Sequence, residues 1–169
     1  MKIIKYVLVA AYSSILLIGC GGKEEKKKEI FSYEKKSDTP QKVEVNENDI
    51  VITGSDAMQF NKKEIKVKAG KKVKITLKHI GKMPKNVMGH NFVLLKQGVS
   101  LTAFGNKAAT ASANEYIPEG SDDVIAHTKL IGGGETAVIE FDAPIAGTYQ
   151  FLCSFPGHYA IMKGMFIVE

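Results

Sequence analysis

Short segments in which apolar and polar residues alternate run from about residue 48 to the C-terminus. Ile50 and Ile52 recur with a period of two in residues 49–53, and the same period recurs in residues 64–68 and 73–78, where the intervening residues are polar. Side chains on a β-strand point alternately to its two faces, so this pattern predicts half-buried strands whose outer faces carry lysine. Four more segments are expected to form strands: residues 91–95, 137–141, 148–153 and 165–168.

Turns that contain glycine or proline separate these segments. Their regular spacing favours an antiparallel sandwich over a parallel sheet with helical crossovers. Residues 98–113 are different, because they are rich in alanine and include Leu101 and Phe104. We expect one short helix within this long connection, so the predicted fold class is all-β with a helical insertion.

The first 19 residues have the features of a leader. Lys2 and Lys5 precede an apolar stretch over residues 6–18, which is shorter than the ~20 residues needed to span a bilayer and is typical of a signal peptide. The stretch leads into Leu-Ile-Gly-Cys20, which resembles the bacterial lipobox. We therefore expect cleavage before Cys20 and lipidation of that cysteine, with an ordinary signal peptide as the alternative.

Residues 20–47 are expected to form a disordered, charged tether between the lipid and a domain over residues 48–169. A lipidated protein of this kind stays anchored to a membrane without spanning it. The expected location is the periplasmic side of the cell envelope. Gly21 and Gly22 after the cysteine favour the outer membrane, and exposure at the cell surface is left open.

The charge of the chain argues against one class of partner. The net charge of +5 comes from lysine, since the chain contains no arginine. Planar, bidentate recognition of bases favours arginine, so nucleic-acid binding is not expected. Of the two cysteines, Cys20 and Cys153, the first is assigned to lipidation, which leaves no pair for a disulfide.

The stretch from residue 152 to residue 164 carries the chemistry. It contains Cys153, His158 and Met162, and a second imidazole, His90, lies far upstream after Gly89. Two imidazoles, a thiolate and a weak thioether form the ligand set of a type 1 (blue) copper site that transfers electrons. The carbonyl of Gly89 is placed to act as a second axial group. This set leaves no open position for substrate, so we do not expect an enzyme.

Two neighbouring residues are expected to support the ligands. Asn91 follows His90 and is predicted to join the two ligand-bearing segments by side-chain hydrogen bonds. The backbone N–H of Phe155 is expected near the sulfur, where it would tune the metal. If Tyr149 and Phe151 face the core, strand alternation places Cys153 on the same inward face.

These motifs resemble azurin, the bacterial blue-copper family. The resemblance is carried by Met-Gly-His-Asn at residues 88–91 and by Cys-Ser-Phe-Pro-Gly-His-Tyr-Ala-Ile-Met-Lys-Gly at residues 153–164, and it extends to residues 58–61, 83–87 and 124–132. It implies an eight-stranded Greek-key β-sandwich of cupredoxin type with a short helical flap. It also implies one copper ion held by the five groups above, and one-electron shuttling in the periplasm.

The resemblance further implies an apolar electron-transfer patch around the exposed edge of His158. The residues assigned to it, besides Phe155, are Met58, Met83, Val87, Met88, Pro156, Ala160 and Ile161. His79 matches a non-ligand azurin histidine linked to pH effects, although a hydrogen-bonded, half-buried histidine is an equal explanation, and His127 is interpreted as a surface residue. Two departures are evident: the usual disulfide near the start of the domain has no cysteines here, and Phe92 stands on the strand that usually carries the core tryptophan.

The function expected from these residues is electron transfer between respiratory redox proteins, with c-type cytochromes or copper reductases as partners. Two alternatives remain open. One is an envelope lipoprotein that binds or sequesters copper without a redox partner. The other is a surface interaction module whose site is structural and holds zinc, which follows copper in the affinity series.

Overall fold

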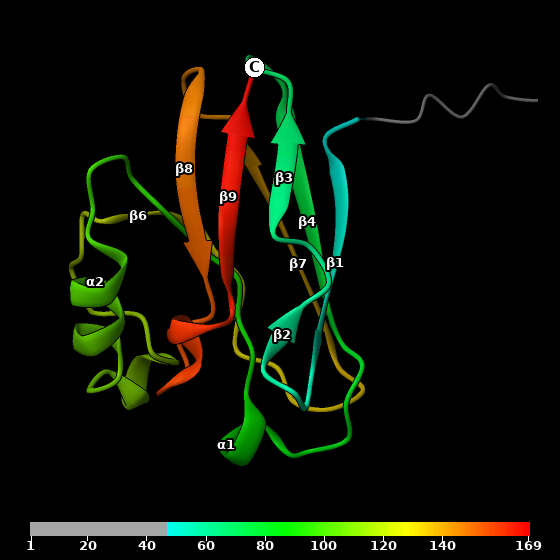
Figure 1. Ribbon diagram of the computed structural model, residues 1–169, viewed down its shortest axis with the longest axis vertical. Coiled ribbons are helices and arrows are strands. Elements are labelled where there is room, and N and C mark those ends of the chain that lie inside the picture. The colour runs from blue at the N-terminus through cyan, green and yellow to red at the C-terminus, as the bar shows by residue number, and fades with distance from the viewer. Residues whose placement is uncertain (1–46) are drawn as a thin grey trace, which may run out of the picture. The chain divides into compact units, whose positions relative to one another are not determined.

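Two β-sheets face each other in the computed structural model, which describes residues 47–169 (Figure 1). The expectations for the leader, for Cys20 and for nearly all of the tether lie outside these residues. The first sheet has the order β2-β1-β4-β7, made of β1 (Asp49–Ser55), β2 (Gln59–Phe60), β4 (Lys72–His79) and β7 (Thr136–Asp142). The second sheet has the order β3-β9-β8-β5-β6, made of β3 (Glu64–Val67), β5 (Val93–Leu95), β6 (Val124–His127), β8 (Gly147–Leu152) and β9 (Lys163–Val168).

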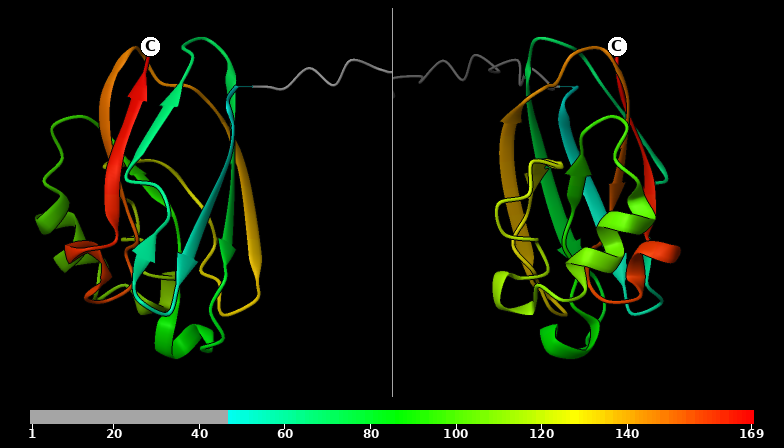
Figure 2. Two further views of the ribbon diagram at one scale, coloured as in Figure 1. Left: turned by 45° about the vertical axis from the view of Figure 1, so that its right-hand side comes forward. Right: turned by 90° about the vertical axis from the view of Figure 1, so that its left-hand side faces the viewer.

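The helices are short and lie outside the two sheets (Figure 2). They are α1 (Lys85–Met88), α2 (Leu101–Ala108) and the 3₁₀ turns η1 (Ser112–Asn114) and η2 (His158–Ala160). Helix α2 is the helix expected within residues 98–113, and the side chain of Ser100 caps it by accepting from the N–H of Ala103. Among the described residues, no helix has the length and apolar character that crossing a membrane requires.

Each of the predicted strand segments contains a strand, and the cupredoxin-type sandwich is confirmed. Strands β2 and β6 were not predicted, because β2 is only two residues long and β6 shows no alternation in burial. Residues 47–169 therefore hold nine strands where eight were expected. Residues 59–67 account for the difference, since β2 pairs with β1 in one sheet and β3 pairs with β9 in the other.

The sandwich is mostly antiparallel, as expected, but two of its strand pairs are parallel. Strand β1 runs parallel to β4, and β3 runs parallel to β9. The remaining strand pairs are antiparallel. The parallel pairs arise because residues 59–67 cross from the first sheet, where β2 lies, to the second, where β3 lies. Since this segment leaves the first sheet, β1 and β4 become neighbours that run in the same direction.

Two apolar clusters hold the fold together. The larger lies between the sheets and contains Phe92, Phe151 and the Cys153 side chain, all fully buried. Phe92 stacks on Phe151 with ring centroids 5.2 Å apart, so phenyl rings fill this core in a chain that has no tryptophan. The smaller cluster lies under α2 and contains Phe104 and Leu152. Burial on both faces of β8 explains why Leu152 is buried although it points away from Cys153.

Asn48 joins the two sheets at the start of the domain. The disulfide that azurins usually carry near this point has no cysteines in this chain. The side-chain Oδ1 of Asn48 accepts from the N–H of Lys68 at 2.8 Å, and its Nδ2 donates to the carbonyl of Lys68 at 3.0 Å. Its own carbonyl accepts from the N–H of Lys74 at 2.9 Å. Asn48 is fully buried, so this clamp links the start of β1 to the segment after β3 without a covalent bond.

Candidate metal centre

The four predicted side-chain ligands lie at one end of the sandwich, on segments that the sheets hold in place. His90 lies between α1 and β5 and exchanges two backbone hydrogen bonds with Ile131. Cys153 follows β8 directly, His158 opens η2, and Met162 precedes β9. The backbone N–H of Cys153 donates to the carbonyl of Met162 at 2.9 Å, which closes the loop between them. All four side chains are buried.

The structure brings three donor atoms together. The ligand atoms of His90, Cys153 and His158 lie within 4.8 Å of one another. The Cys153 Sγ lies 3.5 Å from Nδ1 of His158 and 3.9 Å from Nδ1 of His90, and it lies 3.8 Å from the carbonyl oxygen of Gly89. A buried thiol and two imidazoles directed at one another are a donor set for a thiophilic ion, and they fit one copper ion.

The side chain of Met162 ends beside the His90 ring. A Cβ added to Gly54 would lie 2.7 Å from Cδ2 of His90 and 2.8 Å from the methyl carbon of Met162, so both side chains meet this glycine. Gly89 is equally enclosed, because a Cβ there would lie 2.5 Å from the carbonyl oxygen of Lys85. A larger residue at Gly54 would displace the His90 ring and the Met162 methyl group. One at Gly89 would press on the backbone of Lys85 and on the Phe155 ring.

Asn91 joins the two ligand-bearing segments. Its Oδ1 accepts from the backbone N–H of Ser154 at 2.9 Å, and its Nδ2 donates to Oγ of Ser154 at 2.8 Å. The same Nδ2 donates to the carbonyl of Glu115 at 3.2 Å. Ser154 follows Cys153 and Asn91 follows His90, so this pair sets the separation of the thiol from the first imidazole.

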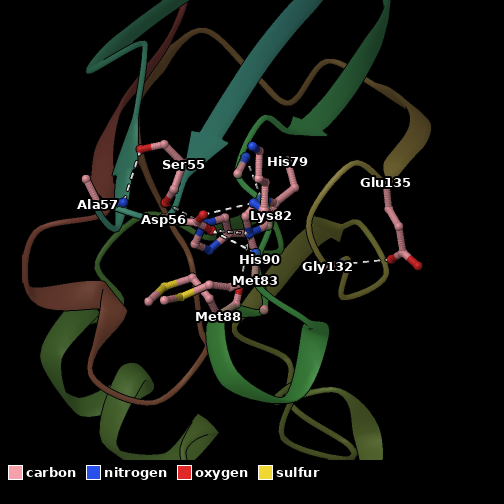
Figure 3. Close-up of polar contacts among 12 residues, drawn as sticks. Ser55, Asp56, Ala57, His79, Lys82, Met83, Met88, His90, Gly132 and Glu135 are labelled. Carbon is pink, nitrogen blue, oxygen red and sulfur yellow. Dashed lines mark hydrogen bonds and ion pairs between the residues drawn. The ribbon is translucent and has the colours of Figure 1, made fainter.

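The His90 ring is oriented from behind by β1 and His79 (Figure 3). Nε2 of His90 lies 2.9 Å from the carbonyl of Ser55, which can only accept, so Nε2 donates and Nδ1 presents its lone pair toward Cys153. The His79 ring stacks on that of His90 with centroids 4.2 Å apart. His79 donates from Nε2 to the carbonyl of Met88 at 2.8 Å and accepts at Nδ1 from the N–H of Gly81 at 3.0 Å.

Asp56 fastens the turn after β1 to the loop before α1. Its carboxylate accepts from the backbone N–H groups of Lys82 at 2.8 Å and Met83 at 3.3 Å, as Figure 3 shows. The first of these bonds is the main reason that the pKa of Asp56 is lowered. The turn that carries the Ser55 carbonyl is therefore held against the segment that leads to His90.

Burial keeps the donor groups uncharged in the metal-free protein. It raises the pKa of the Cys153 thiol to about 12, although backbone N–H groups of Asn91 and Phe155 directed at the sulfur act in the opposite direction. Burial, reinforced by the imidazoles of His90 and His79, lowers the pKa of His158 to about 4. Burial also lowers the pKa of His90. At neutral pH the site is a thiol beside two neutral imidazoles.

Residues assigned to the electron-transfer patch lie on the segments around this end of the sandwich. Val87, Ile161 and Met83 are 53%, 46% and 42% exposed, and Pro156 and Ala160 are also exposed. Met58 and Met88 are half-buried. Phe155 packs against the His158 imidazole with ring centroids 4.7 Å apart, and both residues are buried, so the exposed edge expected of His158 is reduced to the 3% of this residue that is accessible. His127 is exposed, in agreement with its assignment to the surface.

Three supporting groups were not identified from the sequence. Gly54 carried a usable signal, because an isolated glycine inside an alternating strand marks a close approach of another group. The carbonyls of Ser55 and Glu115 carried none, since backbone acceptors have the same chemistry at every residue.

A two-sheet sandwich with a buried His-Cys-His cluster at one end defines a blue-copper, cupredoxin-type protein. The model of the family described as copper binding proteins, plastocyanin/azurin family, matches residues 46–169. Azurin-1 of Alcaligenes xylosoxydans xylosoxydans is 51% identical over 118 residues, which cover 68% of this chain and 92% of that protein. The azurin of Bordetella pertussis is 48% identical over 117 residues, covering 67% of this chain and 78% of that protein.

Solved structures agree with this assignment. Dithionite-reduced auracyanin from Roseiflexus castenholzii superposes with a TM-score of 0.66 at 34% identity, covering 72% of this chain and 97% of that one. An azurin (Az-iso2) from Methylomonas sp. strain J gives a TM-score of 0.66 at 32% identity, with the same coverage of 72% and 97%. The chain belongs to the plastocyanin/azurin family of copper-binding proteins, and its relatives together with the His-Cys-His cluster support a blue-copper electron carrier.

Proposed function

We propose that this protein is a one-electron carrier of the cell envelope, in which Gly89, His90, Cys153, His158 and Met162 hold one type 1 copper ion. The observation that carries the proposal is the cluster of His90, Cys153 and His158, whose donor atoms lie within 4.8 Å of one another in a buried site. Gly89 would complete the set through its carbonyl oxygen, which lies 3.8 Å from the Cys153 Sγ, and Met162 through the thioether whose methyl group meets Gly54 beside the His90 ring. Copper supplies the chemistry by changing between two oxidation states, one electron at a time.

The protein's own contribution is to hold the donors still. Asn91 sets the separation of the two ligand-bearing segments, and Ser55 and His79 orient the His90 ring. Little rearrangement is then needed when the charge at the site changes. Cys153 would give up its Sγ proton to become a ligand, so the raised pKa of this buried thiol predicts an affinity for copper that increases with pH.

Electrons are exchanged through the patch around His158. Exposed apolar side chains there suit short-lived encounters, since redox complexes have small interfaces. Among the large apolar side chains of this patch, Val87 and Ile161 are the most exposed, at 53% and 46%. The proposed partners are c-type cytochromes or copper reductases.

Electron exchange with a c-type cytochrome, measured by stopped-flow mixing of the reduced protein, tests this proposal. Ile161→Lys should slow the second-order rate at least about tenfold, because a charge must then be desolvated at the contact. Ile145→Lys is the matched control: Ile145 is 77% exposed in the turn before β8, at the end of that strand away from Cys153. Equal slowing in both variants would contradict the docking patch.

A wild-type protein that binds copper but exchanges electrons with no cytochrome or copper reductase, and that releases the metal readily to a chelator, would favour copper sequestration instead. An enzymatic role is not part of this proposal, because the proposed ligand set leaves no position for substrate.

Anchoring to the envelope is the second part of the proposal and rests on the sequence of residues 1–20. Labelling of growing cells with a fatty-acid analogue should tag the wild type and not Cys20→Ala. Protease treatment of intact cells then distinguishes a periplasmic from a surface-exposed domain. A Cys20→Ala protein that is labelled like the wild type would contradict the lipid anchor.

A further inference from the structure

Helix α2 lies beside the turn that carries His158. Figures 1 and 2 show α2 and η2 next to each other, and they are in direct contact. Tyr159, the residue after His158, makes the connection. Its hydroxyl donates to Oδ1 of Asn106 on α2 at 2.7 Å. Its ring lies over Gly105, where an added Cβ would come within 2.5 Å of Cγ and Cδ1 of the ring.

Helix α2 is itself firmly attached to the second sheet. Phe104 and Ala108 are buried in the smaller apolar cluster, together with Val93, Leu95, Ile117 and Leu152. Leu152 directly precedes Cys153. The smaller cluster thus touches one ligand segment through Leu152 and the other through Tyr159, which packs against its edge.

Several other residues of the loop around His158 are exposed, although Phe155 and His158 themselves are buried. Pro156, Gly157, Ala160 and Ile161 are exposed, and the hydrogen bonds of residues 158 and 161 run back within the loop to Phe155 and His158. On the far side from α2, Lys63 donates from Nζ to the carbonyl of Ile161 at 2.9 Å. That contact depends on a long, flexible side chain, whereas the Tyr159 ring is rigid and half-buried.

We propose that Tyr159 is a positioning residue of the metal centre: anchored on α2 through Gly105 and Asn106, it holds the His158 imidazole toward Cys153 before a metal arrives and retards release of the bound ion. The inference rests on the proposed function, because it takes His158 to be a ligand. It assigns α2 a role beyond covering the sheet, since the helix becomes the fixed support of the ligand loop.

Amide hydrogen exchange of the metal-free protein tests the support directly. In Tyr159→Phe, exchange over residues 157–161 should accelerate about fivefold, the equivalent of one hydrogen bond, and in Tyr159→Ala it should accelerate further because the ring contact is also lost. Release of copper from the loaded protein to a chelator should become faster in the same order. Tyr149→Phe is the matched control, as it removes a 2.7 Å hydroxyl bond to the Ile145 carbonyl far from the loop, and it should change neither readout.

Asn106→Ala separates positioning from helix stability. The substitution removes the acceptor for Tyr159, yet alanine has a higher helix propensity than asparagine. Positioning predicts that exchange over residues 157–161 becomes faster, as in Tyr159→Phe. A role limited to helix stability predicts that exchange there becomes slower or does not change. Unchanged loop exchange and metal release in both Tyr159→Ala and Asn106→Ala would overturn the inference.

The two proposals fail in different ways. A wild-type protein that forms no thiolate–copper absorption band would overturn the proposed function. The exchange measurement on the metal-free protein would still decide whether Tyr159 holds the loop.

Discussion

Strand β1 begins at a hydrogen-bonded clamp and ends at the metal centre, and both ends bury polar groups. At its start, the amide of Asn48 is paired in both directions with the backbone of Lys68 at 2.8 and 3.0 Å. At its end, Ser55 accepts from the buried ring of His90, whose other nitrogen lies 3.9 Å from the Cys153 sulfur. The first end is satisfied by the protein alone. The second holds weakly partnered donors that a metal ion would complete.

This difference shows how one fold divides its polar groups between stability and function. Buried groups with good partners stabilise the folded chain, whereas buried groups directed at one another at 3.5 to 3.9 Å add little until an ion binds. The metal-free protein therefore depends for stability on the clamp and on the apolar clusters. Changes at the two ends should have separable effects.

Asn91→Ala should have the largest effect on stability. It leaves the buried N–H and hydroxyl of Ser154 without this partner and removes a donor to the Glu115 carbonyl, so we expect a loss of about 4 kcal/mol in the free energy of unfolding. Urea denaturation of the metal-free protein measures it. A broadened or weakened copper band should accompany the loss, because Asn91 links the two ligand segments, and a loss below about 1 kcal/mol would contradict that role.

Lowering the pH should reduce the free energy of unfolding through the buried histidines of the metal centre. The pKa of His158 is lowered from 6.5 to about 4 on folding, so the unfolded chain binds a proton at higher pH than the folded one. Stability is thus fully present above pH 6.5 and is lost as the pH falls toward 4, by on the order of 3 kcal/mol for this group. His90 contributes in the same direction.

Urea denaturation of the metal-free protein at several pH values between 7 and 4 provides this measurement. His158→Asn, which cannot titrate, should flatten the dependence, while Asn48→Ala should leave its slope unchanged. A slope that persists unaltered in His158→Asn would assign the effect to other groups.

Asn48→Ala should destabilise the opposite end without touching the metal. Loss of the paired hydrogen bonds with Lys68 in a fully buried position is expected to cost about 2 kcal/mol. Thermal unfolding of the metal-free protein would detect it, and the copper absorption spectrum of the loaded variant should equal that of the wild type. A shifted spectrum would show that the two ends of β1 are coupled.

Lys72→Ala should have the smallest effect. Its ammonium lies 3.0 Å from the carboxylate of Asp142, but the two side chains are 71% and 85% exposed, so solvent screens the pair. We expect a change below about 0.5 kcal/mol in the free energy of unfolding. A larger loss would mean that exposed ion pairs between β4 and β7 contribute more to the stability of the sandwich than solvent screening allows.

The sequence predicted the metal end better than it predicted the sheets. The spacing of Cys153, His158 and Met162, together with His90, was sufficient to anticipate a copper site, because side-chain chemistry selects the metal. The alternation of Tyr149, Phe151 and Cys153 gave the correct face of β8. The parallel pairing of β1 with β4 could not be anticipated, since alternation is the same in both directions of pairing.

Contacts made by backbone groups, or between segments far apart in the chain, could also not be predicted from the sequence. The burial of Leu152 depends on α2, which covers the outer face of β8, and the contact of Tyr159 with Gly105 joins segments that no local pattern connects. In the sequence, Asn48 cannot be distinguished from any other polar residue before a strand. In each case the partner is decided by the tertiary fold.

The central claim is that Cys153 and the two histidines bind copper as a blue-copper centre, and the visible absorption spectrum tests it most directly. Protein comprising residues 48–169 is titrated with copper(II) and then reduced, with Cys153→Ser as the control. We predict an intense thiolate-to-copper band that is complete at one equivalent, bleaches on reduction and is absent from Cys153→Ser. A colourless product that still binds metal would contradict the account and point to a structural zinc or a storage site.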